Sequence, residues 1–158
     1  MMKRSFYAFA TVGVMLTAIA TSGTAEQSND DLVKKDHKLI EGTWRVVALE
    51  VNGNKSADED VKKLTVVNGS DGAWSLFSEG KEVTKGTSTI FPTQKPKIIE
   101  FTSTEGDQKG QVHLGIYELS ETTRKLCFAP PGKARPTEFS STPGSEHILI
   151  TFEREKAK

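Results

Sequence analysis

The side chains best suited to metal binding are three histidines, His37, His113 and His147, and the single cysteine, Cys127. The histidines are far apart in the sequence. None has the His-x-x-x-His or His-Glu-x-x-His spacing that turns two imidazoles toward one metal ion. Thiolate ligation would need further cysteines, which the sequence lacks. We therefore predict no metal and no cofactor, and a metal site assembled only by the fold is the alternative.

Cys127 and His113 are also the one pair that could supply a nucleophile and its base, since we expect them on adjacent strands. Nothing around Cys127 resembles a cysteine-hydrolase motif, and its neighbours Leu126 and Phe128 are apolar. This pattern favours a buried, inert thiol. With one cysteine, an exported chain has no internal disulfide. We predict a protein that is not an enzyme, and an enzyme that uses the interior of the barrel is the alternative.

A long segment at residues 130–145 carries the other candidate chemistry. It contains four prolines and two glycines, so it is too long for a hairpin and too interrupted for a helix. Lys133 and Arg135 could meet an anionic group of a ligand, and Phe139 could act as a lid. The alternative is that the prolines stiffen a crossover that only covers one end of the domain.

The elements that position these residues are mainly strands, because the chain has a period of two from residue 43 onward. Turn sequences such as Asn52-Gly53 separate the runs. The expected strands cover residues 43–51, 64–68, 73–78, 82–90, 97–102, 111–119, 123–129 and 146–154. A short amphipathic helix is expected at 28–40, capped by Ser28 or Asn29, and a helical turn at 57–63. Eight strands suit a closed, mainly antiparallel barrel, and a β-sandwich is the alternative that strand counting leaves open.

Gly42-Thr43-Trp44 begins the first expected strand, and Arg154 ends the last. This frame resembles the start and end of a lipocalin-like (calycin) β-barrel. The resemblance implies that Gly42 turns the chain into the barrel, Trp44 plugs its closed end, and Arg154 packs its cation on the indole. It also implies an all-β domain that binds something inside.

Further segments resemble a narrower group, an uncharacterised exported domain family expanded in planctomycete bacteria. They are Asp60-Val61-Lys62-Lys63-Leu64, Leu114-Gly115-Ile116-Tyr117-Glu118-Leu119, Leu126-Cys127-Phe128-Ala129-Pro130-Pro131-Gly132-Lys133 and Arg135-Pro136-Thr137-Glu138-Phe139. The resemblance covers roughly residues 36–155. That family is described as lipocalin-like and has no established activity, ligand or catalytic residue, so it implies a fold and a compartment.

Residues 1–25 have the pattern of a secretory signal peptide: a basic start at Lys3 and Arg4, an apolar stretch at 6–20 and a small-residue tail. An uncleaved anchor is the alternative, although the stretch is shorter than the ~20 apolar residues of a spanning helix. We expect a helical or linker segment at 26–41 and the barrel domain at 42–155, in the periplasm or outside the cell. Residues 26–158 hold 19 Lys and Arg against 21 Asp and Glu, which argues against nucleic acid as a partner.

The expected function is binding of a small hydrophobic or amphipathic molecule by a monomer with no membrane span after cleavage. The candidate ligand contacts are Tyr117, Phe128, Lys133, Arg135 and Phe139. The alternative is an interaction module for another protein or for envelope material. Its barrel would be filled by its own aromatic side chains, which are Trp74, Phe77, Phe101, Tyr117 and Phe128.

Overall fold

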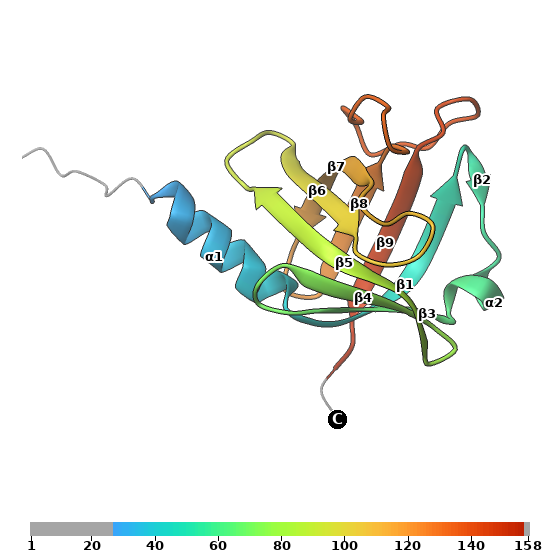
Figure 1. Ribbon diagram of the computed structural model, residues 1–158, viewed down its shortest axis with the longest axis horizontal. Helices are drawn as coiled ribbons and strands as arrows, with labels where there is room; N and C mark the ends of the chain where they lie inside the picture. Colours follow the sequence, from blue (N-terminus) through green and yellow to red (C-terminus); the bar gives the residue numbers. More distant parts are fainter. Residues whose placement is uncertain (1–26, 157–158) are drawn as a thin grey trace, which may run out of the picture.

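The computed structural model describes residues 27–156 (Figure 1). The signal peptide predicted at 1–25 lies outside the described residues. Helix α1 (Asn29–Ile40) is the short N-terminal helix expected from the sequence, and Ser28 caps it, since its Oγ accepts a hydrogen bond from Asp31 N at 3.2 Å. The helix buries Asp36 and Ile40 and leads at Glu41 into the first strand.

Nine strands follow in one sheet. They are β1 (Gly42–Val51), β2 (Asn54–Lys55), β3 (Leu64–Asn68), β4 (Ala73–Ser78), β5 (Lys81–Phe91), β6 (Lys97–Ser103), β7 (Val112–Leu119), β8 (Thr123–Phe128) and β9 (Ile148–Arg154). The short β2 pairs only with the end of β1, and the other eight strands form the barrel wall. A single turn of helix, α2 (Asp58–Val61), lies within the predicted 57–63 and connects β2 to β3.

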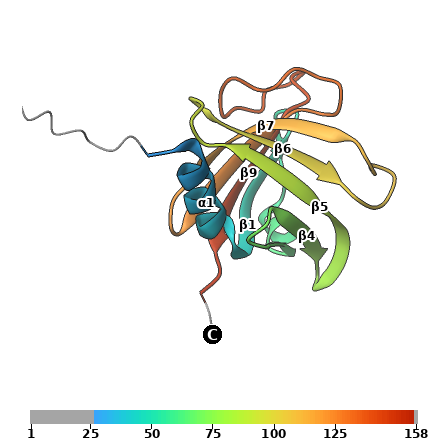
Figure 2. The same ribbon diagram turned by 60° about the vertical axis from the view of Figure 1, so that its left-hand side comes forward.

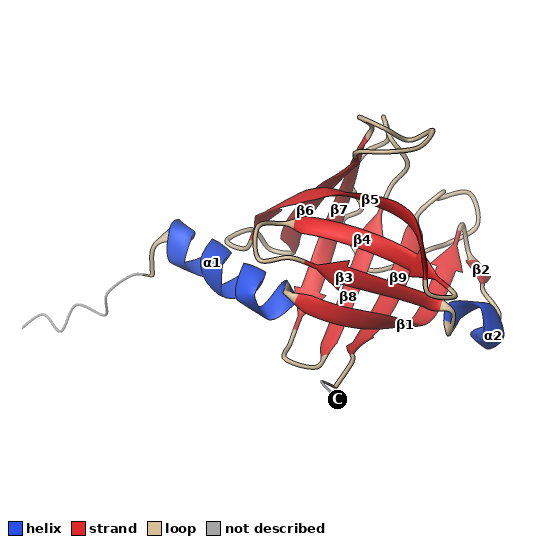
Figure 3. Ribbon diagram, turned by 60° about the horizontal axis from the view of Figure 1, so that its bottom comes forward, coloured by secondary structure: helices blue, strands red, loops and turns tan. Residues whose placement is uncertain are grey.

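The sheet closes on itself because β1 pairs with β3 on one side and with β9 on the other. Every strand pair is antiparallel, and each consecutive pair of wall strands is hydrogen bonded (Figure 3). The prediction of an eight-stranded antiparallel, lipocalin-like barrel is confirmed, and the β-sandwich alternative is wrong because there is one closed sheet. The last strand starts two residues later than predicted, since Glu146 has a φ of 58°, outside the strand region.

The two ends of the barrel differ. α1 and the turn between β7 and β8 lie at the end where β1 begins, whereas α2 and residues 130–145 lie at the end where β1 finishes (Figures 1 and 2). We call these the α1 end and the loop end. Between them, alternate residues of each strand face the interior, so β8 turns Arg124, Leu126 and Phe128 inward and Lys125 and Cys127 outward.

Candidate functional site

Trp44 and Arg154 close the α1 end. The indole of Trp44 is fully buried, and its Nε1 donates to Ile40 O at 2.7 Å. The guanidinium carbon of Arg154 lies 4.3 Å from the ring centroid. That guanidinium also donates to the carbonyl oxygens of Leu39, Glu41 and Glu121. The guanidinium therefore connects the end of α1 and the β7–β8 turn to the α1 end of the barrel.

Gly42 fits this end of the barrel for two reasons. Its φ of 111° is in the region that favours glycine, and a Cβ there would lie 3.1 Å from Nη1 of Arg154. A side chain would therefore be strained and would crowd the guanidinium. The positions of Gly42, Trp44 and Arg154 agree with the positions that the lipocalin-like resemblance implied for them.

Above this closed end the barrel encloses a cavity of about 260 Å³ that is partly open to solvent. Twelve of its lining residues are apolar: Val46, Leu49, Leu64, Val66, Trp74, Leu76, Ile99, Phe101, Leu126, Phe128, Ile150 and Phe152. The uncharged polar lining residues are Asn68, Thr84, Ser88 and Ser103, and among residues 27–156 the one charged lining residue is Arg124. An apolar cavity with a few fixed polar groups is the usual form of a small-molecule site.

A second hollow, of about 480 Å³, lies beside α2 at the loop end and has mixed polar and apolar walls. It shares Leu49 and Leu64 with the interior cavity. The two hollows are therefore adjacent at these side chains.

The interior aromatic residues pack around the cavity and leave it open. Phe101 stacks on His113 at 4.8 Å between ring centroids and makes edge-on contacts with Trp74 at 5.9 Å and Phe128 at 4.7 Å. Three of the five aromatic residues expected to meet in a filled barrel, Trp74, Phe101 and Phe128, thus form its walls. Phe77 is not among the lining residues, so these five side chains do not plug the barrel axis.

Tyr117, a predicted ligand contact, lies at the α1 end and not in the cavity lining. Its hydroxyl donates to Oδ2 of Asp36 at 2.7 Å, and Nζ of Lys97 lies 2.6 Å from the same oxygen. Asp36 is 3% exposed and Tyr117 1%. Burial, and then the hydrogen bond to the Asp36 carboxylate, raise the pKa of Tyr117 well above its ordinary value. This cluster anchors α1 to β6 and β7.

Arg124 and Asn68 form a polar group at the deep, α1 end of the cavity. Nη1 of Arg124 donates to Oδ1 of Asn68 at 3.3 Å, and the two residues are 4% and 5% exposed. No carboxylate among residues 27–156 forms an ion pair with Arg124. Burial lowers the pKa of Arg124 to about 10, so the guanidinium is still charged at neutral pH.

The sequence interpretation did not single out Arg124 or Asn68. The alternation of residues along a strand could have identified Arg124, because it places Arg124 on the same inward face as Leu126 and Phe128. A charged residue in an otherwise apolar inward series is unusual, because a buried charge is costly unless it is paired. The pattern therefore indicates that Arg124 has a role other than packing in the core.

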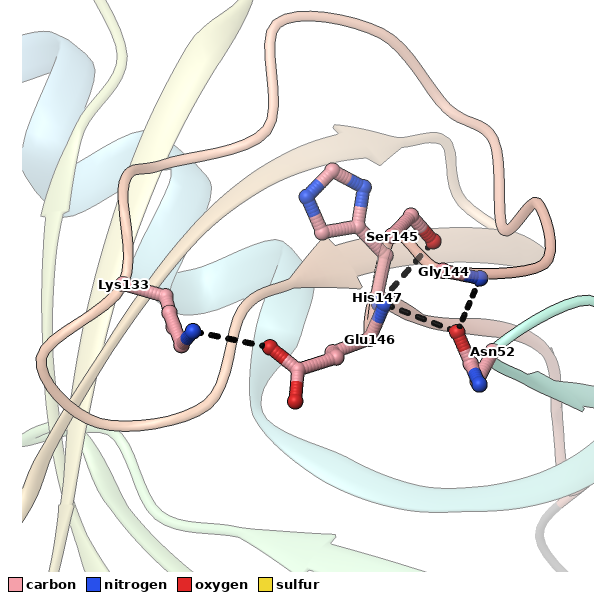
Figure 4. Close-up of polar contacts among 6 residues, drawn as sticks. All are labelled: Asn52, Lys133, Gly144, Ser145, Glu146 and His147. Carbon is pink, nitrogen blue, oxygen red and sulfur yellow. Dashed lines mark hydrogen bonds and ion pairs between the residues drawn. The ribbon is translucent and has the colours of Figure 1, made fainter.

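The loop at 130–145 is held against the barrel by its own polar contacts. Lys133 Nζ lies 3.1 Å from Oε2 of Glu146, and both side chains are exposed (Figure 4). Oδ1 of Asn52 accepts hydrogen bonds from Gly144 N at 2.8 Å and Glu146 N at 3.0 Å. The Asn52 turn of β1 therefore fixes the end of the loop that leads into β9.

Arg135 and Phe139 lie on the outer side of the wall. The Arg135 guanidinium donates to Ile99 O at 3.1 Å, to Gly115 O at 2.9 Å and to Glu100 Oε1 at 2.6 Å. Phe139 is half-buried, with Lys125 Nζ 5.8 Å from its ring centroid. Of the five predicted ligand contacts, only Phe128 lies in the cavity lining, and the structure does not bring the five together.

Cys127 faces outward from β8 beneath the loop and is fully buried, with its Sγ 3.4 Å from Ser140 O. Burial raises the pKa of its thiol. His113 faces the interior on β7, so the two side chains point to opposite sides of the wall. Within residues 27–156, no three His, Cys, Asp or Glu side chains come together in a way that could hold a metal ion.

No protein-family model matches the chain, and neither a curated protein nor a solved structure matches it. The resemblance to the exported planctomycete domain therefore stays a prediction. In the part of the chain that the structure describes, no helix is long and apolar enough to cross a membrane.

Proposed function

We propose that this protein binds a small hydrophobic or amphipathic molecule inside its barrel and performs no catalysis on it. The observation that carries the proposal is the cavity of about 260 Å³ with its mainly apolar walls. An apolar cavity of ~150 Å³ is already large enough to hold a benzene molecule. The volume here lies just below the ~300–1,000 Å³ of pockets for drug-sized ligands, which favours a compact ligand with one chain or ring.

Burial of apolar surface would supply most of the affinity. For a ligand of roughly ten non-hydrogen atoms, a contribution of about 0.5–0.8 kcal/mol per atom gives ~5–8 kcal/mol. This corresponds to a dissociation constant between roughly 1 μM and a few hundred μM. Such an affinity suits a carrier or sensor that releases its ligand again.

Two neighbouring valines on β3 provide a matched test. Val66 lines the cavity, whereas Val67 faces solvent and is 39% exposed. Val66→Phe should fill part of the cavity and weaken decanol binding, measured by calorimetry, by about tenfold or more, while Val67→Phe leaves it unchanged. Circular dichroism would show that both variants are folded. Equal decanol binding by the two variants would contradict the proposal.

We also propose that the protein acts in an exported compartment, on the basis of the signal-peptide pattern of residues 1–25. Membership of the exported planctomycete family is a proposal that rests on the quoted motifs. The alternative function, an interaction module with a filled barrel, has no specific observation in its favour, since the interior aromatic residues line a cavity.

A further inference from the structure

Several hydrogen-bond donors of the cavity lining have no acceptor. In the described part of the chain, five buried side-chain nitrogens have no hydrogen-bond partner, and three of them belong to cavity-lining residues: Nε of Arg124, Nδ2 of Asn68 and Nε1 of Trp74. Arg124 bonds Asn68, and Asn68 and Trp74 are direct register partners on β3 and β4. The three residues that carry these donors are therefore neighbours in the cavity lining.

Such a cluster is costly to an unliganded protein. Each buried donor without an acceptor costs about 1–3 kcal/mol, and a charged donor costs more. Within residues 27–156, no group accepts a hydrogen bond from these three nitrogens. Asp36, the carboxylate buried at this end of the barrel, is already bonded to Lys97 and Tyr117. The positive charge of Lys97 balances that of Asp36, so one uncompensated charge remains, on Arg124.

We propose that Arg124, together with Asn68 and Trp74, binds the carboxylate of an amphipathic monocarboxylate whose apolar body fills the cavity above them. This inference rests on the proposed function and specifies its ligand class. The ligand group must be an acceptor, because all three unpartnered groups are N–H donors. It must be a monoanion, because one guanidinium charge is there to be neutralised.

A carboxylate meets these conditions better than other acceptors. Its two oxygens match the planar N–H fork of a guanidinium, and charge-assisted bonds of this kind are about twice as strong as neutral ones. A neutral alcohol or amide would leave the Arg124 charge uncompensated. A phosphate would carry more negative charge than this cluster can balance. The rest of the molecule must be apolar, since the walls between this cluster and the loop end are formed mainly by aliphatic and aromatic side chains.

The test compares decanoate with decanol, which has the same chain and an uncharged head group, by calorimetry at neutral pH. The unmodified protein should bind decanoate at least about tenfold more tightly than decanol. In Arg124→Met this preference should disappear, through loss of decanoate affinity with decanol affinity retained. Arg45→Met is the matched control. Arg45 is half-exposed on the outside of β1 and pairs with Glu153 at 3.0 Å, so both affinities should be unchanged.

The outcomes separate the two proposals. If Arg124→Met binds decanoate as tightly as the unmodified protein does, the carboxylate inference is overturned and the proposed function stands. The same holds if the unmodified protein binds decanol and decanoate equally. If the unmodified protein binds neither compound, the proposed function itself fails. Decanol binding by Arg124→Met also serves as the check that the variant barrel is folded.

Discussion

Replacing Arg124 by methionine is expected to raise the free energy of unfolding at neutral pH, although it removes a charged and hydrogen-bonded side chain. Burial of the guanidinium, which has no carboxylate partner, lowers the pKa of Arg124 to about 10. At ~1.4 kcal/mol per unit of pKa, this lowering of the pKa corresponds to about 3 kcal/mol of unfavourable free energy in the charged, folded state. Methionine has a flexible apolar side chain that suits the same space.

Two interactions of Arg124 that the substitution removes reduce this gain in stability. The hydrogen bond to Asn68 is long, at 3.3 Å, and is expected to contribute about 1 kcal/mol. The guanidinium carbon lies 5.6 Å from the ring centroid of Phe152, a cation–π contact of about 0.5 kcal/mol. The net expectation is a stabilisation of about 1–2 kcal/mol. This agrees with the general finding that apolar replacement of buried charged groups is often neutral or stabilising.

The pH dependence has a definite sign. Below pH 10 the guanidinium is protonated in both folded and unfolded chains, so the advantage of Arg124→Met is constant. Above about pH 10 the folded unmodified protein releases this proton before the unfolded chain does. Its penalty therefore falls, and the advantage of the variant shrinks.

Urea denaturation of the two proteins at pH 7 and above pH 10 measures both effects. Arg45→Met is again the control, and should change the free energy of unfolding by less than about 1 kcal/mol, because exposed ion pairs contribute little. A destabilisation of Arg124→Met by more than about 1 kcal/mol would refute the reasoning. The guanidinium would then be a structural group, and its burial would need no ligand to explain it.

Two further predictions concern the rest of the barrel. Trp44→Ala should lower the free energy of unfolding, measured by urea denaturation, by about 3–5 kcal/mol, because it removes a fully buried indole together with its contact to Arg154. A loss below about 1 kcal/mol would mean that the closed end of the barrel does not depend on Trp44. Cys127 should react with a thiol reagent at neutral pH only on unfolding, because the side chain is buried and its pKa is raised. Rapid modification of the folded protein would contradict that expectation.

Much of the fold could be predicted because its determinants are local. The period-two runs and their turn residues gave the eight wall strands, and the motif Gly42-Thr43-Trp44 with Arg154 gave the closed end. The residue types predicted Ser28 or Asn29 as the helix cap, and the structure shows that it is Ser28. Closure itself is not local, since it depends on the pairing of β1 with β9 at a sequence separation of about 110 residues. The resemblance, and not strand counting, favoured a barrel over a sandwich.

The site was harder to predict because it depends on which side of the wall each residue faces and on what it bonds there. Lys133 and Arg135 have the residue types for anion binding, but the structure pairs them with Glu146 and Glu100. Arg124 has the same residue type as Arg135 and differs in its surroundings. The pairing of β3 with β1, of β1 with β9 and of β9 with β8 brings it to Asn68 inside the cavity, and no short sequence window contains that information.

Native mass spectrometry of the protein isolated from its own source tests ligand binding in the barrel most directly. We predict that one small amphipathic molecule accompanies each chain, that organic solvent extracts it, and that decanoate then occupies the emptied protein at one copy per chain. Val66→Phe, which fills part of the cavity, should take up less decanoate than Val67→Phe. A chain that carries nothing when isolated and takes up neither decanoate nor decanol would contradict the account.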